Sequence, residues 1–338
     1  MDKMKMELTI GKIRGLQRCS APNGTFTILA LDHRGNLKRA FNPQSPDTVS
    51  YQQIVEFKRA LTTALSPCAD GILLDPVYGA AQTIASGAVH GSTGILVAVE
   101  KTGYAGDASE RVTQILPGWG VDKIARMGAA AVKLLVYYHP EAPNAADQEA
   151  IVARVAEQCQ QNDVPLFLEP LSYSLDPLHP KLASAQKRWV VIETARRLTP
   201  MGVDVLKAEF PVNIGEEPDE KVWAEACGEL SAASVVPWVL LSAGVSYEDF
   251  LRQTRIACQQ GASGVLAGRA VWKEAVQLSV EALDAFLHTT ATKRLTQLAE
   301  VVRAYANPWT DFYPHLEATV GEGWYQQYGT PEKNKPEE

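Results

Sequence analysis

Eight short apolar segments recur along the chain, and their number and spacing restrict the fold more than any other feature. They occupy residues 26–32, 70–75, 94–100, 130–138, 164–170, 203–210, 237–243 and 262–268. Stretches with helical spacing of apolar residues lie between most of them, at 49–65, 145–162, 187–198, 221–233 and 247–260. Strands that alternate with helices pair in parallel through right-handed crossovers. Eight such units predict an α/β fold of the (β/α)8 TIM barrel type, which typically needs about 250 residues.

An open, doubly wound sheet is the alternative α/β fold. Such a sheet usually has a glycine-rich turn after its first strand. In this chain the first apolar segment is followed by HRGN, and neither GxGxxG nor GxxxxGK[ST] lies near it. The barrel is therefore favoured.

The 338 residues are expected to form one domain, 1–338, with the barrel over about 25–304. Residues 1–25 are a short N-terminal lead-in that is expected to cap the bottom of the barrel. Residues 277–304 predict a pair of amphipathic helices that closes the last unit. A C-terminal extension, 305–338, is rich in aromatic residues, and its charged end TPEKNKPEE is expected to be disordered.

Composition excludes several classes of function. The formal net charge of −7 argues against nucleic-acid binding. No apolar run approaches the roughly 20 residues that span a bilayer, and the N-terminus lacks the apolar core of a signal peptide. Five scattered cysteines without a CxxC pair fit reduced thiols. We expect a cytoplasmic homo-oligomer that binds neither membranes nor nucleic acid.

In a barrel of this type the active site forms where the strands end and the βα loops begin. Almost every predicted strand places a polar or ionisable residue there, namely Asp32, Asp75, Glu100 with Lys101, Lys133, Glu169, Lys207 with Glu209, Ser242 and Arg269. Each of them alone has a structural explanation, and for Asp75 a capping role is as good an interpretation as a functional one. The convergence of so many in one barrel mouth favours an active site.

Two lysines lie inside apolar segments, where a charged side chain is unusual. Because side chains alternate along a strand, Lys207 shares a face with Glu209, and Glu169 lies on the strand between Lys207 and Lys133. Two ammonium groups close together disfavour each other's charge, so one lysine is expected to become neutral and attack a carbonyl as a Schiff-base nucleophile. The other stays cationic, and Glu169 transfers protons. This is the chemistry of a metal-free aldolase; a structural Lys–Glu–Lys network in the barrel interior is the alternative.

A metal site is not expected, because the six histidines are dispersed and form no HxH or HExxH pattern. No cofactor is expected either. His33 is the one histidine placed at the barrel mouth, and it is retained as a candidate for substrate binding.

Small-residue turns follow the seventh and eighth predicted strands. In this fold the corresponding loops often hold a phosphate through backbone N–H groups. The residues concerned are Ser242, Ala243, Gly244, Ala267 and Gly268, followed by Arg269. The arginine can add a bidentate, charge-assisted contact, so the turns predict a site for a phosphorylated small molecule.

Eight motifs follow one another over roughly residues 25–280: LALDHRGNLKRA, GILLDPVYG, VEKTGY, AAVKLLVYY, LFLEPLSY, DVLKAEFPVN, LLSAGVS and GVLAGRAVW. In this order they resemble the class I, Schiff-base tagatose 1,6-bisphosphate aldolases and the related aldolases that cleave 6-deoxy-6-sulfofructose 1-phosphate. The resemblance implies that Lys207 forms the imine, Glu169 is the acid/base and Lys133 is its cationic neighbour. It also implies substrate binding by Asp32 and Arg269, and metal-free cleavage of a ketose 1-phosphate to dihydroxyacetone phosphate and an aldehyde.

The full set of residues expected to bind the sugar phosphate is Asp32, His33, Glu100, Lys101, Ser242, Ala243, Gly244, Ala267, Gly268 and Arg269. Two other functions remain open from the sequence. One is a sugar-phosphate isomerase or epimerase that uses carboxylates without an imine. The other is a non-catalytic sugar-phosphate sensor on the same barrel.

Overall fold

A computed structural model of the protein describes residues 8–313 and 320–328. Its strands are β1 (Phe26–Leu31), β2 (Gly71–Leu74), β3 (Gly94–Ala98), β4 (Ala131–Tyr137), β5 (Leu166–Leu171), β6 (Val205–Ala208), β7 (Trp238–Leu241) and β8 (Gly264–Ala267). They pair in parallel in chain order, and β1 also pairs with β8, so the sheet closes into a barrel. The predicted (β/α)8 barrel is confirmed, and each predicted apolar segment contains one strand or nearly all of it.

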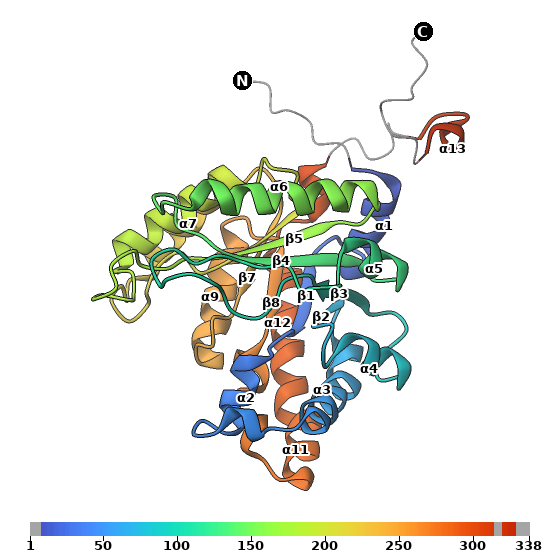
Figure 1. The fold of residues 1–338 in the computed structure, drawn as a ribbon, viewed down its shortest axis with the longest axis vertical. Helices are drawn as coiled ribbons and strands as arrows, with labels where there is room; N and C mark the ends of the chain where they lie inside the picture. The colour runs from blue at the N-terminus through green and yellow to red at the C-terminus, as the bar shows by residue number, and fades with distance from the viewer. Residues whose placement is uncertain (1–7, 314–319, 329–338) are drawn as a thin grey trace.

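Helices surround the strands, and only the last of the described helices lies apart from the barrel, as Figure 1 shows. They are α1 (Ile10–Cys19), α2 (Gly35–Phe41), α3 (Tyr51–Leu65), α4 (Ala80–Ala85), α5 (Val121–Arg126), α6 (Ala145–Gln161), α7 (Ser184–Leu198), α8 (Glu220–Ala233), α9 (Tyr247–Gln259), α10 (Arg269–Trp272), α11 (Val280–Phe286), α12 (Thr292–Tyr305) and α13 (Trp324–Gln327). The predicted helices correspond to α3, α6, α7, α8 and α9. The starts of α3 and α9 are set by Ser50 and Ser246, whose side chains accept a hydrogen bond from the first helical turn. The described part of the chain contains no helix that is both long and apolar enough to cross a membrane.

The helix pair predicted near the end of the barrel is α11 and α12. A π-helical turn, η4 (Leu287–Ala291), joins them into one continuous helical run. The helix α12 packs against α9 and β1, next to the seam where the last strand meets the first.

The bottom of the barrel is closed by α1 together with the start of the C-terminal extension. Lys12 in α1 forms a buried ion pair with Asp204, 3.0 Å away and just before β6. The hydroxyl of Tyr313 donates to the backbone oxygen of Asp204 (2.9 Å), and the indole N–H of Trp309 donates to Ser20 Oγ (3.1 Å). The prediction that the lead-in caps the barrel bottom is therefore confirmed for its described part, residues 8–25. The predicted disorder of the charged end lies outside the described residues, and the single-domain organisation stays a prediction.

The barrel interior changes from apolar to charged along the strands. Near the bottom, inward side chains such as Phe26, Leu73 and Val239 form one apolar cluster with α1 and Trp309. One inward position further along three neighbouring strands, the side chain becomes ionisable: Ala131 is followed by Lys133, Phe167 by Glu169 and Val205 by Lys207. The strands thus place charged groups in the upper barrel, on a floor of packed apolar side chains.

Candidate active site

A cavity of about 700 Å³ lies at the carboxyl ends of the strands. Most of the residues predicted from the sequence line its wall: Asp32, His33, Glu100, Lys101, Lys133, Glu169, Lys207, Ser242, Ala243, Gly268 and Arg269. Gly244 and Ala267 are not brought to the wall. Ala267 belongs instead to the apolar cluster between the strands and the outer helices, because its neighbour Leu266 is the residue that faces inward.

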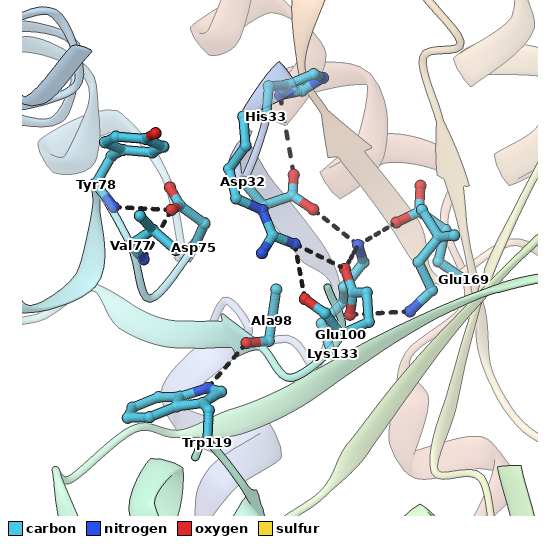
Figure 2. Close-up of polar contacts among 12 residues, drawn as sticks. Asp32, His33, Asp75, Val77, Tyr78, Ala98, Glu100, Trp119, Lys133 and Glu169 are labelled. Carbon is cyan, nitrogen blue, oxygen red and sulfur yellow. Dashed lines mark hydrogen bonds and ion pairs between the residues drawn. The ribbon is translucent and has the colours of Figure 1, made fainter. Parts of the chain in front are cut away.

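Lys133 is the centre of the charged group in Figure 2. Its ammonium lies 2.8 Å from Asp32 Oδ2, 2.9 Å from Glu100 Oε1 and 2.8 Å from Glu169 Oε2, and its side chain is only 1% exposed. Burial alone would lower the pKa of this lysine, but the three carboxylates outweigh it and hold the pKa well above the ordinary value. Lys133 is therefore a fixed cation.

The carboxylates around Lys133 respond in the opposite direction. Burial would raise the pKa of Asp32, but the ammonium groups of Lys133 and Lys207 hold it well below the ordinary value. The same two lysines, with Lys133 the stronger, also lower the pKa of Glu169 against the effect of burial. Both groups are carboxylates at neutral pH.

Lys207 reaches the same oxygen of Glu169 from the other side. Its ammonium nitrogen lies 2.8 Å from Glu169 Oε2, the atom that also contacts Lys133. Lys207 is 4% exposed and lines the cavity. The predicted arrangement of two lysines on either side of one glutamate is therefore present. Among the described residues Lys207 has one carboxylate partner, whereas Lys133 has three.

Glu100 is held in place by its own contacts. Its Oε2 accepts from the backbone N–H of Leu135 (3.1 Å). Arg34 donates to the backbone oxygen of Glu100 (2.8 Å), and its guanidinium lies 3.7 Å from Glu100 Oε1. Sequence reasoning missed Arg34 as a residue of the site, although it follows Asp32 and His33 directly in the motif DHRG. Tyr104, Tyr137 and Leu171, which also line the cavity, were not predicted as site residues either.

The turns after β7 and β8 contact each other. Ser242 Oγ accepts from the backbone N–H of Gly268 (3.3 Å). The next two residues, Ala243 and Gly244, have left-handed backbones with φ of 46° and 81°. A Cβ atom on Gly244 would lie 3.2 Å from the guanidinium carbon of Arg269, so that side chain packs directly on the glycine backbone. Gly244 thus supports Arg269 from behind the cavity wall.

His33 is a neutral side chain at this wall. Burial lowers its pKa to about 4, with Arg269 acting in the same direction and Asp32 opposing it. The imidazole packs edge-to-face on Trp272, with ring centroids 5.1 Å apart. Its Nδ1 lies 3.9 Å from Asp32 Oδ1.

Asp75 does not belong to the cavity. It forms a buried ion pair with Lys58 and accepts from the backbone N–H groups of Val77 (2.9 Å) and Tyr78 (2.8 Å). Figure 2 shows this group separated from the cluster around Lys133. Of the two interpretations that the sequence left open for Asp75, the capping role is the one that the structure supports. Among residues 8–313 and 320–328, no group of three or more His, Cys, Asp or Glu side chains is arranged to hold a metal ion.

The family model described as DeoC/LacD family aldolase matches residues 26–274. The chain belongs to this aldolase family. The tagatose 1,6-diphosphate aldolase of Listeria monocytogenes serotype 4a is 33% identical over 340 residues, which cover 92% of this chain and 97% of that protein. Tagatose 1,6-diphosphate aldolase 2 of Streptococcus mutans is 34% identical over 333 residues, covering 90% and 98%. The protein is an aldolase.

Solved structures share the fold of this aldolase. An archaeal fructose 1,6-bisphosphate aldolase aligns with a TM-score of 0.56 at 24% identity, over 86% of this chain and 98% of that one. The fructose-bisphosphate aldolase of Plasmodium falciparum aligns with a TM-score of 0.69 at 16% identity, over 90% and 98%. At these identities the likeness is one of fold.

Proposed function

We propose that this aldolase is of class I and cleaves a phosphorylated ketose through a Schiff base on Lys207. The observation that carries the proposal is the single Glu169 oxygen that lies 2.8 Å from both Lys207 and Lys133 in the cavity wall. An amine attacks a carbonyl only in its neutral form. Glu169 is the neighbouring group that can take the proton from Lys207, while Lys133 remains charged.

The proton exchange between Lys207 and Glu169 is a coupled one. The positive charge of Lys207 contributes to the low pKa of Glu169. When Lys207 loses its charge, that attraction disappears and Glu169 becomes a better base. When the protonated imine forms, the positive charge returns and Glu169 is again a carboxylate.

The proposed steps follow from this coupling. The neutral amine of Lys207 adds to the C2 carbonyl of the ketose. Glu169 gives its proton to the hydroxyl of the resulting carbinolamine, which leaves as water, and a protonated imine remains. Glu169 then takes the proton of the C4 hydroxyl, the C3–C4 bond breaks, and its electron pair moves into the imine to form an enamine. The aldehyde leaves, Glu169 gives its proton to C3 of the enamine, and water hydrolyses the resulting imine to release dihydroxyacetone phosphate and the free lysine.

The C1 phosphate is assigned to the turns after β7 and β8. Arg269 and Ser242 line the cavity there, next to Gly268, whose backbone N–H donates to Ser242 Oγ. Among the described ion pairs Arg269 has no carboxylate partner, which leaves its guanidinium available for an anion.

Tagatose 1,6-bisphosphate is the substrate that we propose, on the names of the relatives at 33% and 34% identity. The far end of the ketose would meet Arg39 and Lys101, which line the cavity and make no ion pair within the described residues. Such cations attract a phosphate or a sulfonate alike. The runner-up is therefore cleavage of 6-deoxy-6-sulfofructose 1-phosphate, and membership of an aldolase family disfavours the isomerase and sensor alternatives.

A substrate panel tests the proposal. The purified protein is incubated with tagatose 1,6-bisphosphate, fructose 1,6-bisphosphate and 6-deoxy-6-sulfofructose 1-phosphate, and the release of dihydroxyacetone phosphate is followed. We expect release from tagatose 1,6-bisphosphate that Lys207→Arg abolishes, because a guanidinium stays protonated and cannot attack a carbonyl. Release that survives this substitution would contradict the mechanism, and faster release from the sulfonate would favour the runner-up.

A further inference from the structure

Glu209 is a carboxylate in the cavity wall to which the proposed mechanism gives no role. It follows directly after the end of β6, two residues beyond Lys207, which places it roughly 7 Å further along the chain towards the mouth of the barrel. Glu169 and Lys133 lie beside Lys207 at the deeper level. Glu209 is thus placed to meet a part of the substrate beyond the bond that is cleaved.

Ser172, the residue after β5, fixes the orientation of this carboxylate. Its backbone N–H (2.7 Å) and its hydroxyl (2.6 Å) both donate to Glu209 Oε2. Two donors on one oxygen hold the group in a single position, at the end of β5. Within the described residues Oε1 makes no hydrogen bond, which leaves its lone pairs for a ligand.

The charge of Glu209 is not neutralised as that of its neighbours is. Asp32, Glu100 and Glu169 each lie within 2.9 Å of the Lys133 ammonium. Glu209 makes no ion pair within the described chain. An unpaired carboxylate repels the phosphates of the substrate and accepts hydrogen bonds from its hydroxyl groups.

The assigned positions of C1 and C2 fix the direction of the substrate chain. With the C1 phosphate assigned to the turns after β7 and β8, C2 to Lys207 of β6 and the far end to Lys101 after β3, carbons C3 to C5 would cross the cavity past the ends of β5 and β4. In this assignment the hydroxyls at C3 and C4 would lie at the level of Glu169. The C5 hydroxyl would be the next one towards the mouth, on the side where Ser172 holds Glu209.

We propose that Glu209 is a specificity-determining residue that accepts a hydrogen bond from the C5 hydroxyl of the ketose. This hydroxyl is the α-hydroxyl of the aldehyde that is released, so Glu209 selects 2-hydroxyaldehydes over unsubstituted ones. The role rests on the proposed function, because it takes its reference point from the imine on Lys207.

The test uses the condensation direction, with dihydroxyacetone phosphate and two aldehydes of equal size. Glycolaldehyde carries the hydroxyl that becomes the C5 hydroxyl, and propionaldehyde carries a methyl group in its place. Loss of a hydrogen bond to a charged group costs about 1.5–3 kcal/mol, a factor of about 10 to 150. Glu209→Ala should lower kcat/KM for glycolaldehyde by this factor and leave kcat/KM for propionaldehyde nearly unchanged. Ser172→Ala, which removes one of the two orienting donors, should give a smaller loss in the same direction.

Two controls keep the outcomes distinct. Glu209→Gln preserves the shape of the side chain and should lose part of the preference for glycolaldehyde over propionaldehyde. This variant replaces Glu209→Ala in the test if Glu209→Ala does not fold. Borohydride trapping of dihydroxyacetone phosphate on Lys207 is measured in every variant. Suppose that the variants form the trapped adduct normally, but kcat/KM falls equally for both aldehydes or for neither. The role of Glu209 is then overturned and the Schiff base stands. If the wild-type protein traps nothing, the proposed function fails, and the role of Glu209 fails with it.

Discussion

Replacing Lys133 by methionine removes the cation around which the buried carboxylates are arranged. Methionine keeps most of the side-chain length, so the main change is in charge. In Lys133→Met the carboxylates of Asp32, Glu100 and Glu169 lose an ammonium that lay 2.8, 2.9 and 2.8 Å away. Removing one partner of a buried ion pair typically costs about 3–5 kcal/mol. We therefore expect the free energy of unfolding to fall by about this amount or more at neutral pH.

The pH dependence of this loss has a definite sign. In the wild-type protein the pKa values of Asp32 and Glu169 are lowered, chiefly by Lys133 against the effect of burial. Their contribution to stability is present above the unfolded pKa, about 4, and is lost as the pH falls through the lower folded pKa. Without Lys133 burial dominates, and protonation of these carboxylates relieves an unfavourable charge. The stability difference between wild type and Lys133→Met should be largest near pH 7 and narrow towards about pH 4.

Urea unfolding at several pH values measures this difference, and Lys12→Met is the matched control. Lys12 is also a buried lysine in an ion pair, 3.0 Å from Asp204, but at the opposite end of the barrel. Both variants should be less stable, whereas only Lys133→Met should lose kcat, by about 10²-fold or more, because Lys133 positions Glu169. The electrostatic explanation would be refuted if Lys133→Met had the same free energy of unfolding as the wild type. It would also be refuted if the difference between the two free energies grew as the pH fell. An unchanged kcat would leave the cluster as a structural network.

Three further perturbations separate chemistry from architecture. Glu169→Gln should keep the fold and lower kcat by about 10²- to 10⁴-fold, measured as release of dihydroxyacetone phosphate; early melting with normal turnover would instead indicate a structural role. Arg269→Ala should weaken the binding of dihydroxyacetone phosphate by about 10- to 150-fold, measured by calorimetry, and leave the binding of dihydroxyacetone unaffected. Equal weakening of the binding of both ketones would place the phosphate site elsewhere. Activity should survive EDTA, because the imine supplies the electron sink; a loss that zinc restores would contradict a class I mechanism.

The fold and the floor of the site were predictable because both depend on periodicity. Apolar segments too short for helices, separated by amphipathic stretches, specify parallel strands with their helices. Alternation along those strands correctly placed Lys133, Glu169 and Lys207 on inward positions. Their mutual contact then follows from the closure of the barrel in chain order.

Contacts across the barrel were less accessible to sequence reasoning. The mutual repulsion of the two lysines is visible in the sequence, but the contacts of Lys133 with Asp32, after β1, and Glu100, after β3, fix its charge and are not. These distances depend on strand tilt and on side-chain conformation, which the sequence does not display. Ala267 shows a second limit. In a strand that is apolar at every position, such as β8, alternation does not reveal which residues face inward.

The location of the covalent intermediate is the most direct test of the account. The protein is incubated with dihydroxyacetone phosphate, the imine is reduced with borohydride to a stable secondary amine, and the modified peptide is identified by mass spectrometry. Only an imine is trapped in this way, and Lys207→Arg serves as the control. We predict one adduct, on Lys207, and none in the variant. An adduct on Lys133, or no adduct in the wild-type protein, would contradict the central claim.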